Sequence, residues 1–223
     1  MNITVEHAER SLNSVYIVVD TSFILKDILV RRHLDSEALI ERCMYIRSVS
    51  GKSLRLPEGV EREMKKSLCE YMYDKNVRNS INMFRRKHHF PAIPNTEELY
   101  YYDFFKSQIE RVGKQLNKDS ETRDLSPIDM HIGAYSILKT IKGEVILCTQ
   151  DDLLMTTVRK VYDVAHSVFA ERKKSNRLLY IARTPVDIES TLDAIGRLKG
   201  KRRLELELLH QAKEFGFENC SPS

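Results

Sequence analysis

Three polar side chains follow the most apolar stretch near the start of the chain. The stretch SVYIVVDTSFIL, residues 14–25, rises through Val and Ile to Asp20 and then presents Thr21 and Ser22. A continuous β-branched run predicts a strand buried on both faces, and open parallel sheets bind ligands just beyond the carboxyl ends of their strands. Asp20 is therefore either the first acid of a site or the cap of the next helix, a position that Asp commonly occupies.

Asp20 is one of six carboxylates at expected strand ends or on adjoining helices. The others are Glu61, Glu63, Asp129, Asp151 and Asp152. The helix expected around Asp129 carries Ile132, Gly133 and Ser136 on the same side, which indicates a packed face. A carboxylate on a packed face is costly unless it is paired or bound to a metal. Several converging carboxylates would repel one another, and a divalent cation usually relieves that repulsion.

Alternating strands and helices must position these acids. Apolar runs and turn residues predict strands over residues 16–20, 143–149 and 177–182, and a turn with a short strand over residues 50–57. Helical spacing predicts helices over residues 35–49, 58–87, 96–118, 126–141, 150–175, 184–198 and 201–215. This alternation predicts an α/β fold, a parallel sheet of about five strands flanked by helices, with a C-terminal helical extension. We expect an N-terminal arm (1–13), one domain (14–196, with a helical segment over about 65–125), and a C-terminal amphipathic helix and tail (197–223).

Composition narrows the class of protein. The chain has 223 residues, a net charge of +4, and no apolar run near the length of about 20 residues that crosses a bilayer. Its first fourteen residues are polar and lack the apolar centre of a secretory signal. The four cysteines are scattered without the CxxC spacing of a zinc or redox site. These features predict a cytoplasmic protein that does not bind membranes.

Four short motifs occur in a fixed order: VVDTS, LPEGVEREM, SPIDMHIGA and VILCTQDDL. In this order they resemble the PIN-domain family of metal-dependent ribonucleases, over residues from about 14 to about 195. The resemblance implies a compact parallel α/β domain in which four acids bind Mg²⁺ or Mn²⁺, as one or two ions, and hydrolyse RNA phosphodiesters. The matching catalytic and metal-binding positions are Asp20, Glu63, Asp129 and Asp151.

The resemblance also distinguishes neighbouring residues. It selects Glu63 over Glu61, and it implies that Ser22 and Thr149 hold the carboxylates in place. Asp20 and Asp151 are expected to bind the metal directly, and Glu63 and Asp129 directly or through water. Many family members carry another acid where this chain has Leu153, and the part played by the adjacent Asp152 stays open.

Candidate partners are RNA and a second copy of the chain. Basic clusters could contact RNA, although such clusters are often only solvated faces: Arg85, Arg86, Lys87, Lys201, Arg202 and Arg203. The aromatic residues of ELYYYDFF, residues 98–105, could stack on unpaired bases or pack a core or a dimer. The apolar stripe of the C-terminal segment must cover either the open side of the sheet or a second subunit, and the second alternative predicts a homodimer or a higher homo-oligomer.

The leading interpretation is a metal-dependent endoribonuclease, with RNA processing as its role. Two alternatives stay open, a non-catalytic PIN-like RNA-binding or scaffold protein and the toxin of a toxin–antitoxin pair. Two other phosphate-handling folds are excluded. A haloacid-dehalogenase-like phosphatase needs an acid where Ser22 stands, and P-loop or dinucleotide folds need a glycine-rich turn after the first strand.

Overall fold

A parallel sheet lies at the centre of the protein, with its strands in the order β4-β1-β5-β6. The computed structural model describes residues 15–83, 96–118, 124–171 and 178–198. The four strands are β1 (Val15–Val19), β4 (Leu54–Arg55), β5 (Glu144–Cys148) and β6 (Leu179–Ala182). All three strand pairings are parallel. The α/β prediction is therefore confirmed, with four strands of the main sheet among the described residues where about five were expected.

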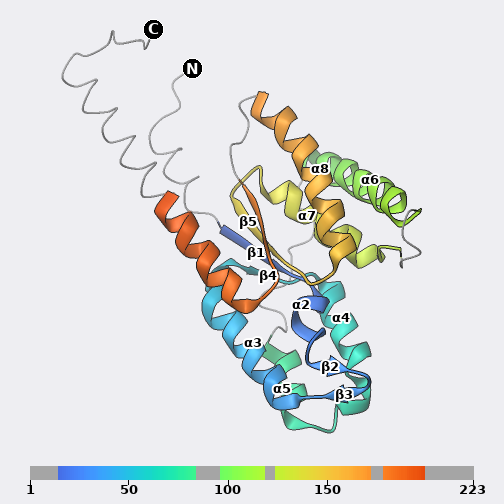
Figure 1. Ribbon diagram of the computed structural model, residues 1–223, viewed down its shortest axis with the longest axis vertical. Helices are drawn as coiled ribbons and strands as arrows, with labels where there is room; N and C mark the ends of the chain where they lie inside the picture. Colours follow the sequence, from blue (N-terminus) through green and yellow to red (C-terminus); the bar gives the residue numbers. More distant parts are fainter. Residues whose placement is uncertain (1–14, 84–95, 119–123, 172–177, 199–223) are drawn as a thin grey trace, which may run out of the picture.

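Helices cover both faces of the sheet. They are α2 (Thr21–Leu25), α3 (Ser36–Ser50), α4 (Glu58–Ser67), α5 (Lys75–Met83), α6 (Thr96–Lys118), α7 (Pro127–Lys139), α8 (Asp152–Glu171) and a helix over residues 185–198. Helices α6, α7 and α8 pack together on one side, whereas α3 and the helix of residues 185–198 lie on the other (Figure 1). Every residue of β5 is buried, as expected for a strand covered on both faces. Among the described helices, none has the length and apolar composition needed to cross a membrane.

One local expectation is wrong, and one small element was not predicted. The helix predicted over residues 58–87 is broken after α4 by a 3₁₀ turn, Cys69–Tyr71, and α5 begins only at Lys75. The side chain of Asp74 accepts a hydrogen bond from the backbone N–H of Asn76 at 2.7 Å, which provides a start for α5 that the spacing does not reveal. A small antiparallel hairpin, β2 (Leu29–Val30) and β3 (His33–Leu34), was not predicted, because two-residue strands leave no periodicity.

Three of the predicted segments lie outside the described residues. They are the N-terminal arm, the basic cluster Arg85–Lys87 and the C-terminal segment that contains Lys201, Arg202 and Arg203. The predictions made for them stay predictions.

Candidate acidic site at the carboxyl edge of the sheet

The pairing of β1 with β5 determines where the first and last acids lie. Val19 is in register with Cys148, and the backbone N–H of Asp20 donates to the carbonyl of Cys148 at 3.0 Å. Asp20 therefore leaves the sheet at the same edge as the segment Thr149–Asp151. The two similar strand endings in the sequence become neighbours because the strands are parallel and adjacent.

The other two acids are supplied by helices. Asp129 lies in the first turn of α7, where it forms a capping box with Ser126: each residue's side chain accepts a hydrogen bond from the other's backbone N–H, at 2.8 and 3.1 Å. Glu63 lies on α4, and its Oε2 accepts a hydrogen bond from the Thr21 hydroxyl at 2.7 Å. Both contacts hold a carboxylate at a helix end or face that adjoins the sheet edge.

All four predicted acids line a single cavity of about 460 Å³: Asp20, Glu63, Asp129 and Asp151, together with Thr21, Ser22, Lys66, Ser67, Asp124 and Ser126. The acids come from four separate segments of the chain, and the strand pairing and helix packing bring them to the same cavity. Glu61 and Asp152 do not belong to it. Glu61 pairs with Lys65 at 2.5 Å, and Asp152 pairs with Arg183 at 2.8 Å.

Two hydroxyl groups hold the Asp20 carboxylate. Ser22 Oγ and Thr149 Oγ1 both donate to its Oδ2, the latter at 2.9 Å. These hydroxyls are themselves held, because Ser22 Oγ accepts from the backbone N–H of Gln150 at 3.0 Å and Thr149 Oγ1 from that of Asp151 at 3.1 Å. Asp20 precedes α2, but its side chain makes no capping hydrogen bond there. The helix-cap alternative therefore does not describe its role in the structure.

Burial perturbs the carboxyl group of Asp20. Its side chain is 3% exposed, and desolvation raises its pKa from 3.8 to about 6. The negative charge of Asp129 raises the pKa further, whereas the hydrogen bonds from Ser22 and Thr149 oppose the shift. An ionised Asp20 is thus unfavourable in this cavity until positive charge is supplied.

The donor set suits a hard divalent cation, since the cavity offers carboxylate and hydroxyl oxygens and neither cysteine nor histidine. The side chains are not already gathered into a coordination sphere. Within the described ranges, no group of three or more His, Cys, Asp and Glu side chains is close enough to hold a metal ion. The donor chemistry of the cavity thus suits Mg²⁺ or Mn²⁺, whereas the positions of the side chains do not form a coordination sphere.

Sequence reasoning missed two charged residues of the cavity, Lys66 and Asp124. Lys66 follows Glu63 by three residues on α4, so helical spacing could have placed it on the same side. Asp124 accepts a hydrogen bond from the Asn117 side chain at 2.7 Å, a contact between the end of α6 and the approach to α7. Nothing local in the sequence indicates that contact.

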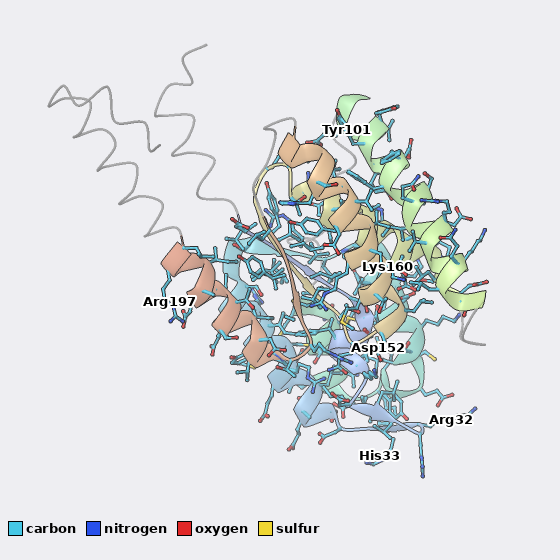
Figure 2. All side chains as sticks on the ribbon, turned by 45° about the horizontal axis from the view of Figure 1, so that its top comes forward. Arg32, His33, Tyr101, Asp152, Lys160 and Arg197 are labelled. Atoms are coloured by element: carbon cyan, nitrogen blue, oxygen red, sulfur yellow. The ribbon has the colours of Figure 1, made fainter. Side chains whose placement is uncertain are left out.

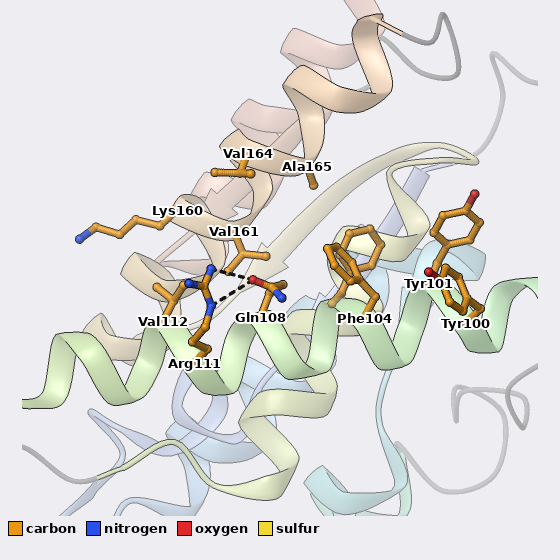
Figure 3. Close-up of a pocket in the computed structure, with 11 residues that line it drawn as sticks. Tyr100, Tyr101, Phe104, Gln108, Arg111, Val112, Lys160, Val161, Val164 and Ala165 are labelled. Atoms are coloured by element: carbon orange, nitrogen blue, oxygen red, sulfur yellow. Dashed lines mark hydrogen bonds between the residues drawn. The ribbon is translucent and has the colours of Figure 1, made fainter.

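The aromatic residues of α6 divide into two sets. Tyr102 and Phe105 are buried in the core, whereas Tyr100 and Phe104 are 71% and 49% exposed. The exposed pair lines an apolar groove of about 350 Å³ between α6 and α8, with Lys160 and Arg111 also along it (Figure 3). The groove has no acid among its lining residues, so it is not a second candidate for a cation site.

Comparison with known proteins does not identify the chain. No protein-family model matches it, and neither a curated protein nor a solved structure matches it either. The resemblance to PIN-domain ribonucleases thus depends on the motifs and on the placement of their residues.

Proposed function

We propose that this protein is a metal-dependent endoribonuclease that hydrolyses RNA phosphodiester bonds. The observation that supports the proposal most strongly is the shared cavity of Asp20, Glu63, Asp129 and Asp151. A folded protein tolerates such crowding poorly unless the acids bind something positively charged. The proposal includes a cytoplasmic location and a homo-oligomeric state, as the composition and the C-terminal apolar stripe predict.

The four carboxylates would hold one or two Mg²⁺ or Mn²⁺ ions. When bound, the ion lowers the pKa of water and offsets the negative charge that develops on the phosphate during hydrolysis. The protein's own hydrogen bonds would orient two of the carboxylates for this chemistry. Ser22 and Thr149 fix one oxygen of Asp20, and Thr21 fixes one oxygen of Glu63. Lys66 adds a cation at the cavity, beside which an RNA phosphate would be stabilised.

A matched pair of neighbouring acids tests the proposal. Asp151→Asn removes a carboxylate of the cavity, whereas Asp152→Asn removes an exposed one that pairs with Arg183. We expect Mn²⁺-dependent cleavage of a labelled single-stranded RNA to fall at least about 100-fold in Asp20→Asn and Asp151→Asn and to persist in Asp152→Asn. EDTA should abolish cleavage by the wild-type protein.

The outcome also separates the alternatives. Undiminished cleavage by folded Asp20→Asn protein would contradict the assignment of the site. RNA binding without metal-dependent cleavage by the wild-type protein would instead indicate the non-catalytic RNA-binding alternative. Cleavage that a co-expressed small partner suppresses would indicate a toxin rather than a processing enzyme.

A further inference from the structure

The β2–β3 hairpin closes with a turn made only of two arginines. Val30 pairs with His33, so Arg31 and Arg32 are the whole loop. Both have positive φ, 47° and 66°, and they are the only non-glycine residues with positive φ in the part of the chain that the structure describes. Two-residue hairpin turns of this kind strongly favour Asn-Gly, because a Cβ disfavours the left-handed conformation.

The backbone conformation of this turn therefore disfavours two arginines. A role for their side chains explains better why arginines occur there. Strained backbone persists where the surroundings hold it, and it gathers at functional positions. Here the surroundings include the Tyr71 hydroxyl, which donates a hydrogen bond to the carbonyl of Arg32. This contact ties the strained turn to the segment that follows α4.

The turn presents its charges to solvent. Arg31, Arg32 and His33 are all exposed, and Figure 2 shows Arg32 and His33 at the outer end of the hairpin. Among the described residues, no carboxylate forms an ion pair with either arginine. Two adjacent guanidinium groups without carboxylate partners are well suited to bidentate contacts with phosphate.

The hairpin also lies near the acidic cavity. Helix α4, which carries Glu63 and Lys66 at the cavity, leads directly to the 3₁₀ turn that contains Tyr71. Ser67 lines the cavity, and Tyr71, which contacts Arg32, follows four residues later, so at most about 14 Å of chain separates these two residues. Figure 1 shows α4 and the hairpin on the same side of the molecule, with α2 beside them. A strand of a few nucleotides could therefore contact the arginines and the cavity at once.

We propose that the Arg31–Arg32 turn is an RNA-binding site that grips the phosphates of the single strand entering the acidic cavity. The identity of the ligand as RNA rests on the function proposed above. Lys66 lines the cavity beside the acids, so positive charge is present both at the turn and at the cavity. The arginine pair contributes affinity and takes no part in the chemical step.

Replacing the turn by its favoured sequence tests this site without damaging the fold. Arg31→Asn combined with Arg32→Gly should keep or raise the melting temperature, because Asn-Gly suits the turn. The same variant should bind single-stranded RNA about tenfold more weakly at moderate salt. The negative slope of log K against log salt should become shallower by about 1.4, since two phosphate contacts are lost at about 0.7 each. Binding is measured in EDTA with Asp20→Asn as the background, so that cleavage is not required.

Two control variants make the result specific. Arg31→Lys with Arg32→Lys keeps the charge but loses the bidentate contacts, so it should bind more weakly than the parent protein and more tightly than the Asn-Gly variant. Arg47→Gln with Arg197→Gln removes two exposed arginines on α3 and the helix of residues 185–198 and should bind as the parent does. Unchanged affinity in the Asn-Gly variant, an equal loss in the Arg47/Arg197 control, or no RNA binding by the parent would overturn the proposal.

The same protein set distinguishes this site from the proposed function. Metal-dependent cleavage by the wild-type protein, with affinity unaffected by the Asn-Gly turn, would overturn the arginine site and leave the nuclease standing. Affinity that depends on the arginines, without cleavage by the wild-type protein, would support the site and overturn the nuclease.

Discussion

Among the four acids of the cavity, Asp20 is the most buried, and its two hydroxyl partners oppose only part of the desolvation that burial causes. The carboxylate thus combines a fixed orientation with an unfavourable charge. Both properties would favour metal binding, because the carboxylate is already oriented and its negative charge is uncompensated. In the absence of metal, the same residue should weaken the fold as it ionises.

The stability of the metal-free protein should therefore depend on pH through Asp20. Its pKa is about 6 when folded and near 3.8 when unfolded, so its contribution is fully present below pH 3.8 and is lost as pH rises through 6. The shift of 3.8 to about 6 corresponds to a loss of about 3 kcal/mol. Asp20→Asn should remove this loss, as measured by urea unfolding in EDTA at pH 4 and 7.5. Asp152→Asn is the control and should lose as much stability as wild type. If Asp20→Asn also loses as much stability as wild type over that pH range, this account of Asp20 is wrong.

Glu61 and Glu63 lie two residues apart on α4 but have different surroundings. Glu63→Gln should lower cleavage at least about 100-fold with little loss of stability, because Glu63 lines the cavity. Glu61→Gln should leave the rate per folded molecule unchanged and lower stability, because Glu61 is 7% exposed and paired with Lys65. Cleavage rates and thermal unfolding of the two variants provide the measurements. The reverse pattern would show that Glu61 is the acid of the site.

At the scale of the elements, α4 and α7 approach each other at Gly59 and Ile128, and they carry Glu63 and Asp129 to one cavity. Gly59 is the point of approach, since a Cβ there would stand 2.7 Å from Cγ1 and 2.8 Å from Cδ1 of Ile128. These distances are shorter than carbon atoms tolerate. The absence of a side chain at Gly59 thus permits the helix contact on which the placement of two acids depends.

Gly59→Ala should destabilise the protein by about 1–3 kcal/mol and lower cleavage, because α4 must move away from α7. Combining it with Ile128→Ala should recover part of the loss, since the truncated side chain makes room for the new methyl group. The free energies of unfolding of both single variants and the double variant give the coupling. Strictly additive effects would show that the two residues do not limit the approach of the helices.

At the scale of the whole molecule, the cavity joins segments from the beginning, middle and end of the described chain. Asp20 and Asp151 are separated by 131 positions in the sequence. Helices α4 and α7, which lie between them in the sequence, contribute the other two acids. A ligand bound there connects the sheet to two helices. Its binding energy therefore stabilises the folded state as a unit.

Mn²⁺ should raise the melting temperature of the wild-type protein, and EDTA should reverse the rise. At a free concentration 100-fold above Kd, the stabilisation is about 2.7 kcal/mol for one site. Differential scanning calorimetry of wild type, Asp152→Asn and the double variant Asp20→Asn/Asp151→Asn measures the effect. A rise of the same size in the double variant would place the cation elsewhere.

Several features of this protein were readable from local patterns. Burial and helix capping are each indicated by a pattern of a few residues. Examples are the β-branched run before Asp20, the buried strand before Thr149 and the Ser-Pro start of the helix that carries Asp129. They predicted the parallel α/β class, which the structure confirms. The acids proposed for the site followed from the same strand ends together with the family resemblance.

Other features depended on contacts between distant segments, which leave no local pattern. The inclusion of Asp124 in the cavity became visible only in three dimensions. Parallel pairing of β1 with β5 and the approach of α4 to α7 decide which acids meet. Periodicity reports which face of an element is buried, whereas packing of one element on another decides which side chains become neighbours.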